Sequence, residues 1–443
     1  MTRVFDYQYL EQLALQSVQN QTDTGLFIPT PFPIPPSILN VIGVLLILIM
    51  VILSNAGGLG GGGNLTPFIM IFFNLSLIEC IPIGNFLGFI SAMCRFVINF
   101  RQKHPNNPRR LAIDYEIIEL SMPLLYLGTL FGVQIGTRLT EIQLAIVFAI
   151  VLFFVAFKTA EKAYKMIREE NKKALALNQN HLSYIDNQQL KTRLLSEDQD
   201  LMLKNHQKMI QLQNGLIEQS SQLQSIMREE SQHFTVKRCF NFIITLGFLI
   251  ITSMLLNSKD RFAVNIYYQY LAVGLFIIYS LVSTYYISKN LQRNYYIKLI
   301  EGYHFDKHDI TYESTKPIIK VILLCHISGI LGGIVGIAGG IILGPLFLQL
   351  GMLPVLVAST NQYLALISTI AVSFQYWYLG MLNLQYIIVL GSVTVLGCYI
   401  GIKQVQVIVQ KSGRQSIMVV ILAIVLFLSF SMIPVKYWLK SLE

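Results

Sequence analysis

Strongly apolar runs, separated by short polar or glycine-rich segments, cover most of this chain. A helix needs about 20 apolar residues to cross a bilayer, and several runs approach or reach that length. The pattern therefore predicts an all-α polytopic membrane protein. The runs are Ile38–Leu53, Leu65–Cys80, Gly84–Phe100, Ile117–Thr137, Ile142–Phe157, Cys239–Leu256, Ile266–Ile287, Ile318–Leu331, Ile341–Leu350, Val355–Tyr378, Leu384–Ile402 and Ile417–Phe430.

Changes in polarity divide the chain into six parts. In chain order we expect a polar, proline-rich N-terminal tail at 1–36, membrane repeat 1 at 37–160, a cytoplasmic helical insert at 161–236, two additional transmembrane helices and a loop at 237–315, membrane repeat 2 at 316–434, and a C-terminal tail at 435–443.

Composition agrees with an integral, multi-pass membrane protein. Hydrophobic residues make up 53% of the chain and charged residues 13%, whereas soluble proteins are about a quarter charged. The net charge of +9 fits basic cytoplasmic loops better than nucleic-acid binding. The five cysteines form no CxxC motif, which indicates buried thiols rather than a zinc site or a disulfide framework.

The polar insert leaves two interpretations open. Its Gln, Asn, Lys and Glu residues predict helix, either a long hairpin pairing as a coiled coil or a solvated linker. A coiled coil would offer a surface for a homo-oligomer or a protein partner. Apolar residues recur every seven positions, although the second seam is only partly apolar. The first seam comprises Leu195, Met202, Met209, Leu216 and Leu223.

Two glycine-rich stretches interrupt the apolar pattern. Gly57–Pro67 contains six glycines between apolar runs. Gly332–Pro345 is a degenerate second copy, in which apolar residues separate the glycines. Each glycine inside a helix costs about 1 kcal/mol relative to alanine. Non-helical backbone survives in a membrane only when it is buried in protein or lines a cavity. We therefore expect a broken helix at each stretch.

The two stretches belong to an internal repeat. Aligning Pro67 with Pro345 brings further pairs into register and predicts two homologous halves. The pairs are Gly58, Gly61 and Gly62 with Gly336, Gly339 and Gly340; Asn85 with Asn361 after a two-residue slip; Ser91 within one position of Ser368; and Gly132, Gly136 and Arg138 with Gly397, Gly401 and Lys403.

Charge predicts that the halves are inverted. If each half makes five passes, counting the short run after the glycines, the basic loops at 101–114, 158–237, 289–316 and 403–414 share one side. With four passes, the N-terminus and the 403–414 loop fall on less consistent sides. An odd number inverts the second half. Ile341–Leu350 is too short to cross fully at 1.5 Å per residue, so we expect a half-helix.

Short, glycine-broken segments in matching places point to a transporter's binding site. A helix starting after Gly63 or Gly340 leaves N–H groups that favour an anion, and nearby neutral side chains add donors. Alternatively, the glycines only allow close helix packing, and the polar side chains only bond between helices. The candidate substrate-binding residues are Gly61, Gly62, Gly63, Asn64, Asn85, Ser91, Gly339, Gly340, Thr360, Asn361, Gln362 and Ser368.

These motifs resemble a known family. Gly60–Pro67, Gly336–Pro345 and the glycine-spaced segment Gly128–Arg138 are similar to motifs of the sulfite exporter TauE/SafE family of membrane transporters. The resemblance covers both halves but not the tail or the 158–316 insert. It implies movement of sulfite, sulfonates or related sulfur anions across a membrane.

Other candidate chemistry is weaker. Gly58–Gly63 satisfies GxGxxG but follows a membrane helix rather than a strand, so we expect no dinucleotide cofactor. The loop residues His304, Asp306, His308 and Asp309 are expected to be solvated rather than to bind a metal.

Ionisable residues in apolar segments merit a functional hypothesis. His326 is a candidate proton-coupling group, and Glu79 is a weaker one. Lys320 is close enough to a helix end to reach water. Arg95 and Arg138 are expected near helix ends, facing the basic side.

The sequence therefore predicts a secondary transporter of small anions, sulfite or related sulfur oxyanions and organosulfonates. It would act by alternating access around the two glycine-rich broken helices, with the anion and the lipid bilayer as partners. The alternative is a non-transporting membrane scaffold or receptor acting through its helical insert. An enzyme is not expected, since no nucleophile–base pair or paired intramembrane carboxylates are present.

Overall fold

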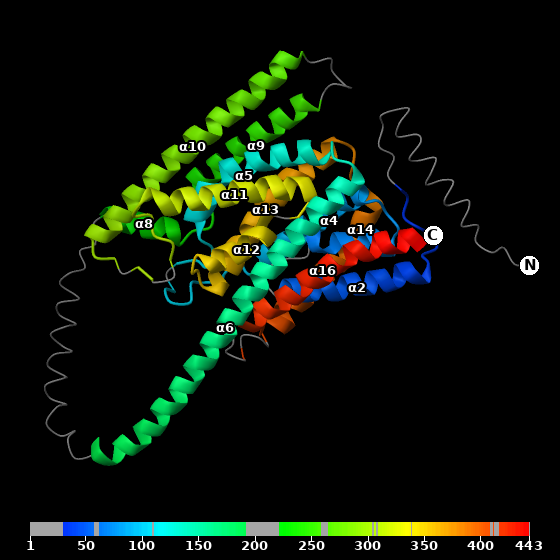
Figure 1. Ribbon diagram of the computed structural model, residues 1–443. Coiled ribbons are helices and arrows are strands. Elements are labelled where there is room, and N and C mark those ends of the chain that lie inside the picture. The colour runs from blue at the N-terminus through cyan, green and yellow to red at the C-terminus, as the bar shows by residue number, and fades with distance from the viewer. Residues whose placement is uncertain are drawn as a thin grey trace, which may run out of the picture.

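The computed structural model describes residues 30–56, 62–108, 110–191, 221–257, 265–303, 305–306, 309–337, 339–407, 411 and 416–442. Within these residues the chain is helical and contains no β-strand. Most helices lie side by side in one bundle, with α9 and α10 as an outer pair (Figure 1). The fold therefore confirms the all-α prediction.

In the described part of the chain, ten helices are long and apolar enough to cross a membrane. The protein is a multi-pass integral membrane protein. The ten are α2 (Ile38–Ala56), α4 (Leu77–Ile98), α5 (Tyr115–Gly136), α6 (Glu141–Lys191), α9 (Val236–Leu256), α10 (Ile266–Ile300), α11 (Thr315–Val335), α13 (Pro354–Tyr378), α14 (Leu384–Ile400) and α16 (Ser416–Leu442). Shorter elements are the 3₁₀ turn η1 (Gly63–Leu65), α3 (Thr66–Phe72), α8 (Ser221–Glu230), α12 (Gly339–Gln349) and the π-helical turn η3 (Gly401–Gln406).

The start of α4 differs from the apolar pattern. That pattern ends one run at Cys80 and begins the next at Gly84, and this boundary, which falls at Pro82, is wrong because Pro82 lies inside the helix. A capping box begins α4: Ser76 Oγ accepts from Glu79 N, and the Glu79 carboxylate accepts from Ser76 N. The cap satisfies two helix-end donors, so the chain turns before it, at Asn74 with φ 50°. Neighbouring helices let membrane helices tolerate an interior proline.

Helices α5 and α11 pack backbone to backbone. A Cβ atom on Gly333 would lie 2.7 Å from the carbonyl oxygen of Thr129 and 2.8 Å from Cα of Gly132. One on Gly136 would lie 2.8 Å from the carbonyl oxygen of Ile334. Residue numbers rise together along the contact, so the two helices run parallel. The small residues thus allow the close approach seen in membrane helix pairs.

Helices α2 and α14 pack in the same manner. Gly397 faces Val51, and Gly401 faces the backbone of Ile52 and the side chain of Asn55. This pair is also parallel. In Figure 1, α2 runs away from the end of the bundle that holds the C-terminus, whereas α11 runs toward that end.

The remaining central helices pair in antiparallel fashion. Asn85 Nδ2 of α4 donates to Ser373 Oγ of α13 at 2.8 Å. Asn99 Nδ2, further along the chain, donates to the earlier Gln362 Oε1 at 3.3 Å. Helices α4 and α13 therefore run in opposite directions.

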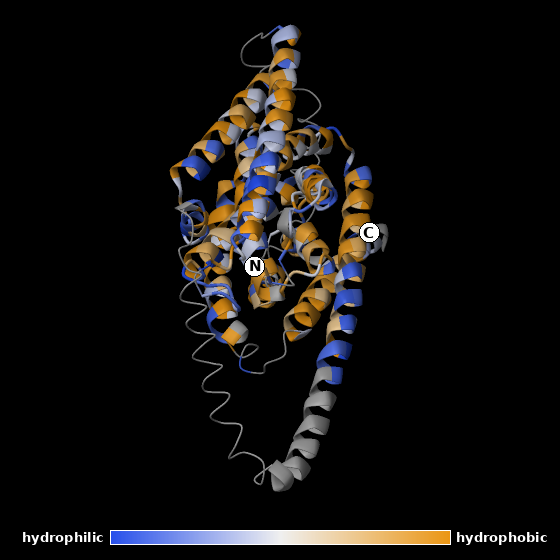
Figure 2. Cartoon of the chain, turned by 90° about the vertical axis from the view of Figure 1, so that its left-hand side faces the viewer, coloured by the Kyte–Doolittle hydropathy of each residue, from blue (hydrophilic) through white to orange (hydrophobic). Residues whose placement is uncertain are grey.

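Helices α6 and α16 are likewise antiparallel. Glu170 of α6 accepts from the backbone nitrogen of Ser416 at 2.9 Å, whereas the earlier Phe153 packs on the later Phe430 with ring centroids 5.4 Å apart. Helix α6 continues without a break through the predicted boundary at 160. It becomes hydrophilic where it leaves the bundle (Figure 2).

The coiled-coil prediction falls mainly outside the described residues. Of its first seam, the structure describes Leu223 on α8, and that side chain is buried. Helix α8 also buries Ile226 and lies against α10. Leu223 therefore packs within the bundle, and the other positions of that seam lie outside the described residues.

Ion pairs join the loops at one end of the bundle. Arg110 pairs with Asp309 at 2.6 Å and with Glu230 at 3.1 Å. Lys298 pairs with Glu230 and, at 3.0 Å, with Glu116. The loop at 101–114, α8 and the end of α10 therefore meet at the same end.

We expect Gly132→Ala to destabilise the protein, because its Cβ would clash with the carbonyl oxygen of Ile330 on α11. Overpacking of this kind costs about 1–3 kcal/mol. Gly274→Ala on α10 is the matched control, since its Cβ would meet nothing within 4 Å. Thermal unfolding of both purified variants measures the effect. Equal midpoints for the two variants would contradict the close packing of α5 on α11.

Candidate functional site

The two glycine stretches meet in the middle of the bundle. A Cβ on Gly63 would lie 2.5 Å from Cα of Ile337, so the two backbones touch. Gly336 has φ 63°, a conformation that favours glycine, and its Cβ would lie 2.8 Å from the carbonyl oxygen of Ile81. Segments distant in sequence thus share one crossing point.

The predicted glycines lie around this crossing. Gly62 and Gly63 are buried and lead into α3 through η1. Gly339 and Gly340 are the first two residues of α12. Gly61 lies outside the described residues. Both short helices therefore begin at a glycine stretch.

Asn64 is fixed at the start of α3. Its Nδ2 donates to Ser54 Oγ at 2.6 Å, and its backbone oxygen accepts from Ser429 Oγ at 2.8 Å. Its Oδ1 is buried and has no hydrogen-bond partner among the described residues. The Thr66 hydroxyl is also buried without a hydrogen-bond partner among the described residues. Two polar atoms at the start of α3 therefore have no partner in this part of the chain.

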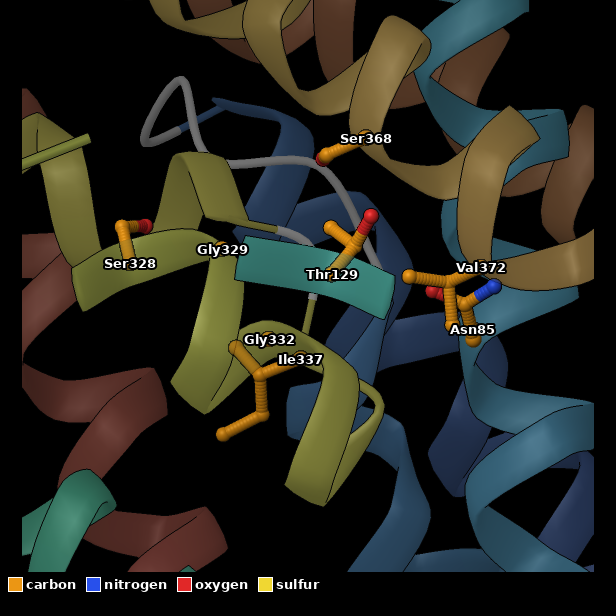
Figure 3. A pocket seen from close by; sticks show the side chains of 8 residues that line it. All are labelled: Asn85, Thr129, Ser328, Gly329, Gly332, Ile337, Ser368 and Val372. Carbon is orange, nitrogen blue, oxygen red and sulfur yellow. The ribbon is translucent and has the colours of Figure 1, made fainter. Parts of the chain in front are cut away.

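Asn85 and Ser368 line one narrow pocket, with about 160 Å³ of space between its atoms but no room for a water-sized sphere. In Figure 3, Asn85 lies beside Val372, and Thr129 lies between them and Ser328. The lining comes from α4, α5, α11, α13 and the link after α11, and its side chains are all neutral. The full lining is Asn85, Thr129, Ser328, Gly329, Gly332, Ile337, Ser368 and Val372.

Ser91 belongs to a different polar cluster. Its Oγ donates to Asn55 Oδ1 at 3.0 Å, and Cys398 Sγ donates to the same oxygen at 3.3 Å. This cluster joins α2, α4 and α14. Ser91 does not line the pocket of Asn85.

The predicted residues at the start of α13 lie toward the ion-paired end. Thr360 Oγ1 accepts from the backbone nitrogen of Asp114 at 2.9 Å, and Gln362 Oε1 accepts from Asn99 Nδ2. Asn361 is buried, with no partner for Oδ1 among the described residues. The candidate residues therefore occupy several levels of the bundle, and the structure gathers only some of them.

Sequence reasoning missed several residues near the crossing. Thr129 and Ser328 line the pocket, and Tyr376 Oη donates to the carbonyl oxygen of Gly333 at 3.0 Å. Asn55 stands two residues before the first glycine stretch. Thr129 lies within the glycine-spaced motif of α5. The closeness of Asn55 and Thr129 to glycine motifs could have marked them as candidate site residues.

The ionisable candidates have structural partners. The His326 ring donates to the carbonyl oxygen of Leu124 at 2.8 Å, which ties α11 to α5. Glu79 accepts from Thr30 and Ser76 at a helix start. Lys320 is exposed. Arg95 was expected near a helix end, facing the basic side. It does lie in the last turn of α4, but its side chain is only 2% exposed because α13 covers that end.

Charges outside the membrane segments stabilise the loop end. Burial alone would raise the pKa of Asp309, but the nearby His104 ring and a hydrogen bond from Arg110 lower it below its ordinary value. Burial raises the pKa of Asp114 to about 6, and the Glu116 carboxylate adds to this rise. The neighbouring carboxylates hold Arg110 charged.

A metal site does not emerge from the described residues, which contain no group of three or more His, Cys, Asp or Glu placed to hold an ion. Asp306 accepts from Asn106 Nδ2, and Asp309 is engaged in the ion pairs above. His304 and His308 lie outside the described residues.

Comparison with known proteins points to one family. The family model described as "Sulfite exporter TauE/SafE" matches residues 223–428. The chain is similar to this family over that region, and to curated members of it over most of its length. Sulfite exporter TauE/SafE family protein 1 of Arabidopsis thaliana is 24% identical over 409 residues, covering 89% of this chain and 82% of that protein. Family protein 2 of the same plant is 24% identical over 421 residues, with 93% and 86% coverage. No solved structure gives a significant match.

The family model covers a different part of the chain from the motifs. The motifs exclude 158–316, and this limit is wrong from residue 223 onward, because the match begins there and includes α8, α9 and α10. The match does not extend to the motifs at 60–67 and 128–138. These helices lack the glycine motifs. They nevertheless pack on the bundle, where Glu230 and Lys298 join the ion pairs.

We expect a compensating pair of substitutions at the crossing. Gly84→Ala should destabilise the protein, because its Cβ would clash with Thr66 Oγ1, whereas Thr66 Cβ lies at 3.5 Å. Thr66→Ala removes an oxygen without a partner among the described residues and should be tolerated alone. The double variant should regain most of the lost stability in thermal unfolding, as contacting residues couple. Additive losses would exclude this contact.

Proposed function

We propose that this protein is a secondary transporter of small anions, with sulfite, related sulfur oxyanions and organosulfonates as the substrate class. The observation that carries the proposal is the contact between the two glycine stretches at Gly63 and Ile337, beside a pocket lined from both membrane halves. The names of the TauE/SafE relatives support the substrate class.

We further propose that residues 37–160 and 316–434 are inverted repeats. Their first helices, α2 and α11, each pack in parallel on a glycine-rich helix of the other half. The pairs α4–α13 and α6–α16 each join equivalent helices in antiparallel directions. This reciprocal pattern is what a two-fold axis in the membrane plane produces.

In this mechanism the halves rock against each other around the glycine crossing. Helices α3 and α12 each begin at a glycine stretch, and the two stretches touch at Gly63 and Ile337, so both N-termini lie near this crossing. N-terminal N–H groups favour an anion. The neutral lining around Asn85 suits a substrate that must be released again. Gly61–Asn64, Asn85, Gly339, Gly340 and Ser368 are the central residues of this proposal, and the other candidates lie further along the path.

The scaffold alternative has less support. It depends on the insert at 161–236, of which 192–220 lie outside the described residues. The family match instead extends over membrane helices through residue 428. Transport therefore remains the stronger proposal.

Flux of labelled sulfite, thiosulfate and taurine into proteoliposomes tests the function. We expect saturable uptake of at least one of these anions, reduced more than about tenfold in Gly62→Leu and Asn85→Leu, because the first fills the crossing and the second removes two donated hydrogen bonds. Gly274→Leu on α10 should transport normally, since that position is open.

Correct folding of each variant is checked by a monodisperse elution profile before reconstitution. Wild-type vesicles that take up none of the three anions would contradict the transport proposal. Normal uptake by both Gly62→Leu and Asn85→Leu would instead show that the substrate does not bind at the glycine crossing.

A further inference from the structure

A positive charge is buried at some distance from the neutral pocket. Arg95 lies in the last turn of α4, where a long side chain would ordinarily reach water, yet it is 2% exposed. Its Nη2 donates to the carbonyl oxygen of Ala358 on α13 at 3.3 Å. Arginine stays protonated in proteins, and a buried charge within a membrane segment is costly and marks functional sites.

An unused donor lies on the same seam. Gln362 is 1% exposed, and its Nε2 has no hydrogen-bond partner among the described residues. Asn99 Nδ2 donates to Gln362 Oε1, which orients the amide and leaves Nε2 as the available donor.

Helical spacing brings the two groups together. Ala358 and Gln362 are four residues apart on α13 and share one helix face. Asn99 is the C-cap of α4, and its backbone nitrogen donates to the carbonyl oxygen of Arg95, so it lies one turn beyond Arg95. The two contacts that cross the seam join Arg95 to Ala358 and Asn99 to Gln362. The guanidinium and the amide therefore lie on adjacent turns of one buried seam.

We propose that Arg95 and Gln362 Nε2 form a second anion subsite, which takes the oxyanion or sulfonate group of the substrate at the ion-paired end of the α4–α13 seam. The proposal rests on the anion transport proposed above. A guanidinium fork matches the paired oxygens of an oxyanion, and the amide adds a neutral donor.

This subsite is separate from the central pocket. Arg95 follows Asn85 by ten residues, which is about 15 Å along a helix. The pocket residues are neutral, so the seam supplies a full positive charge that the pocket lacks. Arg95 belongs to the first membrane half and Gln362 to the second, so relative movement of the halves would open or close this subsite.

Equilibrium binding to the purified full-length protein tests the proposal, with labelled sulfite, sulfate and methanesulfonate as probes. We expect Arg95→Gln to raise the dissociation constant at least tenfold for the anion bound. Arg95→Lys should raise it several-fold, because it keeps the charge but loses the fork, and Gln362→Leu should do the same. Arg101→Gln is the matched control, an exposed arginine at the same end, and should bind like wild type.

The outcomes separate this subsite from the transport proposal. Wild-type affinity in Arg95→Gln would overturn the proposed subsite. The transport proposal would be unaffected by that result, because the flux assay tests it separately. Arg95-dependent binding of sulfate or methanesulfonate without sulfite would support the subsite and reject sulfite as substrate. If wild type binds none of the three, the subsite is rejected. If Arg95→Gln does not fold, unchanged affinity in both Arg95→Lys and Gln362→Leu rejects it equally.

Discussion

The structure depends on backbone surfaces that have no room for a Cβ atom. In a membrane, apolar side chains gain little by leaving lipid for a neighbouring helix, so close packing sets where helices meet. Helices α5 and α11 meet through Gly132, Gly136 and Gly333. That contact fixes the end of α11, and the following Gly336 and Ile337 then reach Ile81 and Gly63. The crossing at the centre is thus positioned by packing elsewhere in the bundle.

The helices were predictable because hydropathy is a local property. An apolar run must be helical in lipid, so the membrane helices could be located from the sequence. The start of α4 was misplaced because the capping box at Ser76 and Glu79 outweighs the proline that follows it. The sequence contained that cap, but hydropathy alone does not reveal it.

The contacts of the candidate site were less predictable. The repeat alignment matches Asn85 with Asn361, but the structure pairs Asn85 with Ser373. An alignment of repeats proposes equivalent positions, and it does not state which residues touch in the folded chain. The burial of Arg95 could not be predicted from its own helix, which ends nearby and suggests exposure. The folded chain places α13 over this helix end. Ser328, with nothing unusual in its local sequence, and Thr129, marked only by its place in the glycine-spaced motif, line the pocket because α5 packs on α11.

Helix α6 has a mechanical consequence. It is one continuous element of 51 residues, about 75 Å long at 1.5 Å per residue, and its first part is packed against α16. A stiff rod held at one end acts as a lever. If the halves rotate against each other by a few degrees, the far end of α6 moves by several ångströms. A conformational change inside the bilayer would thus displace a segment well outside it.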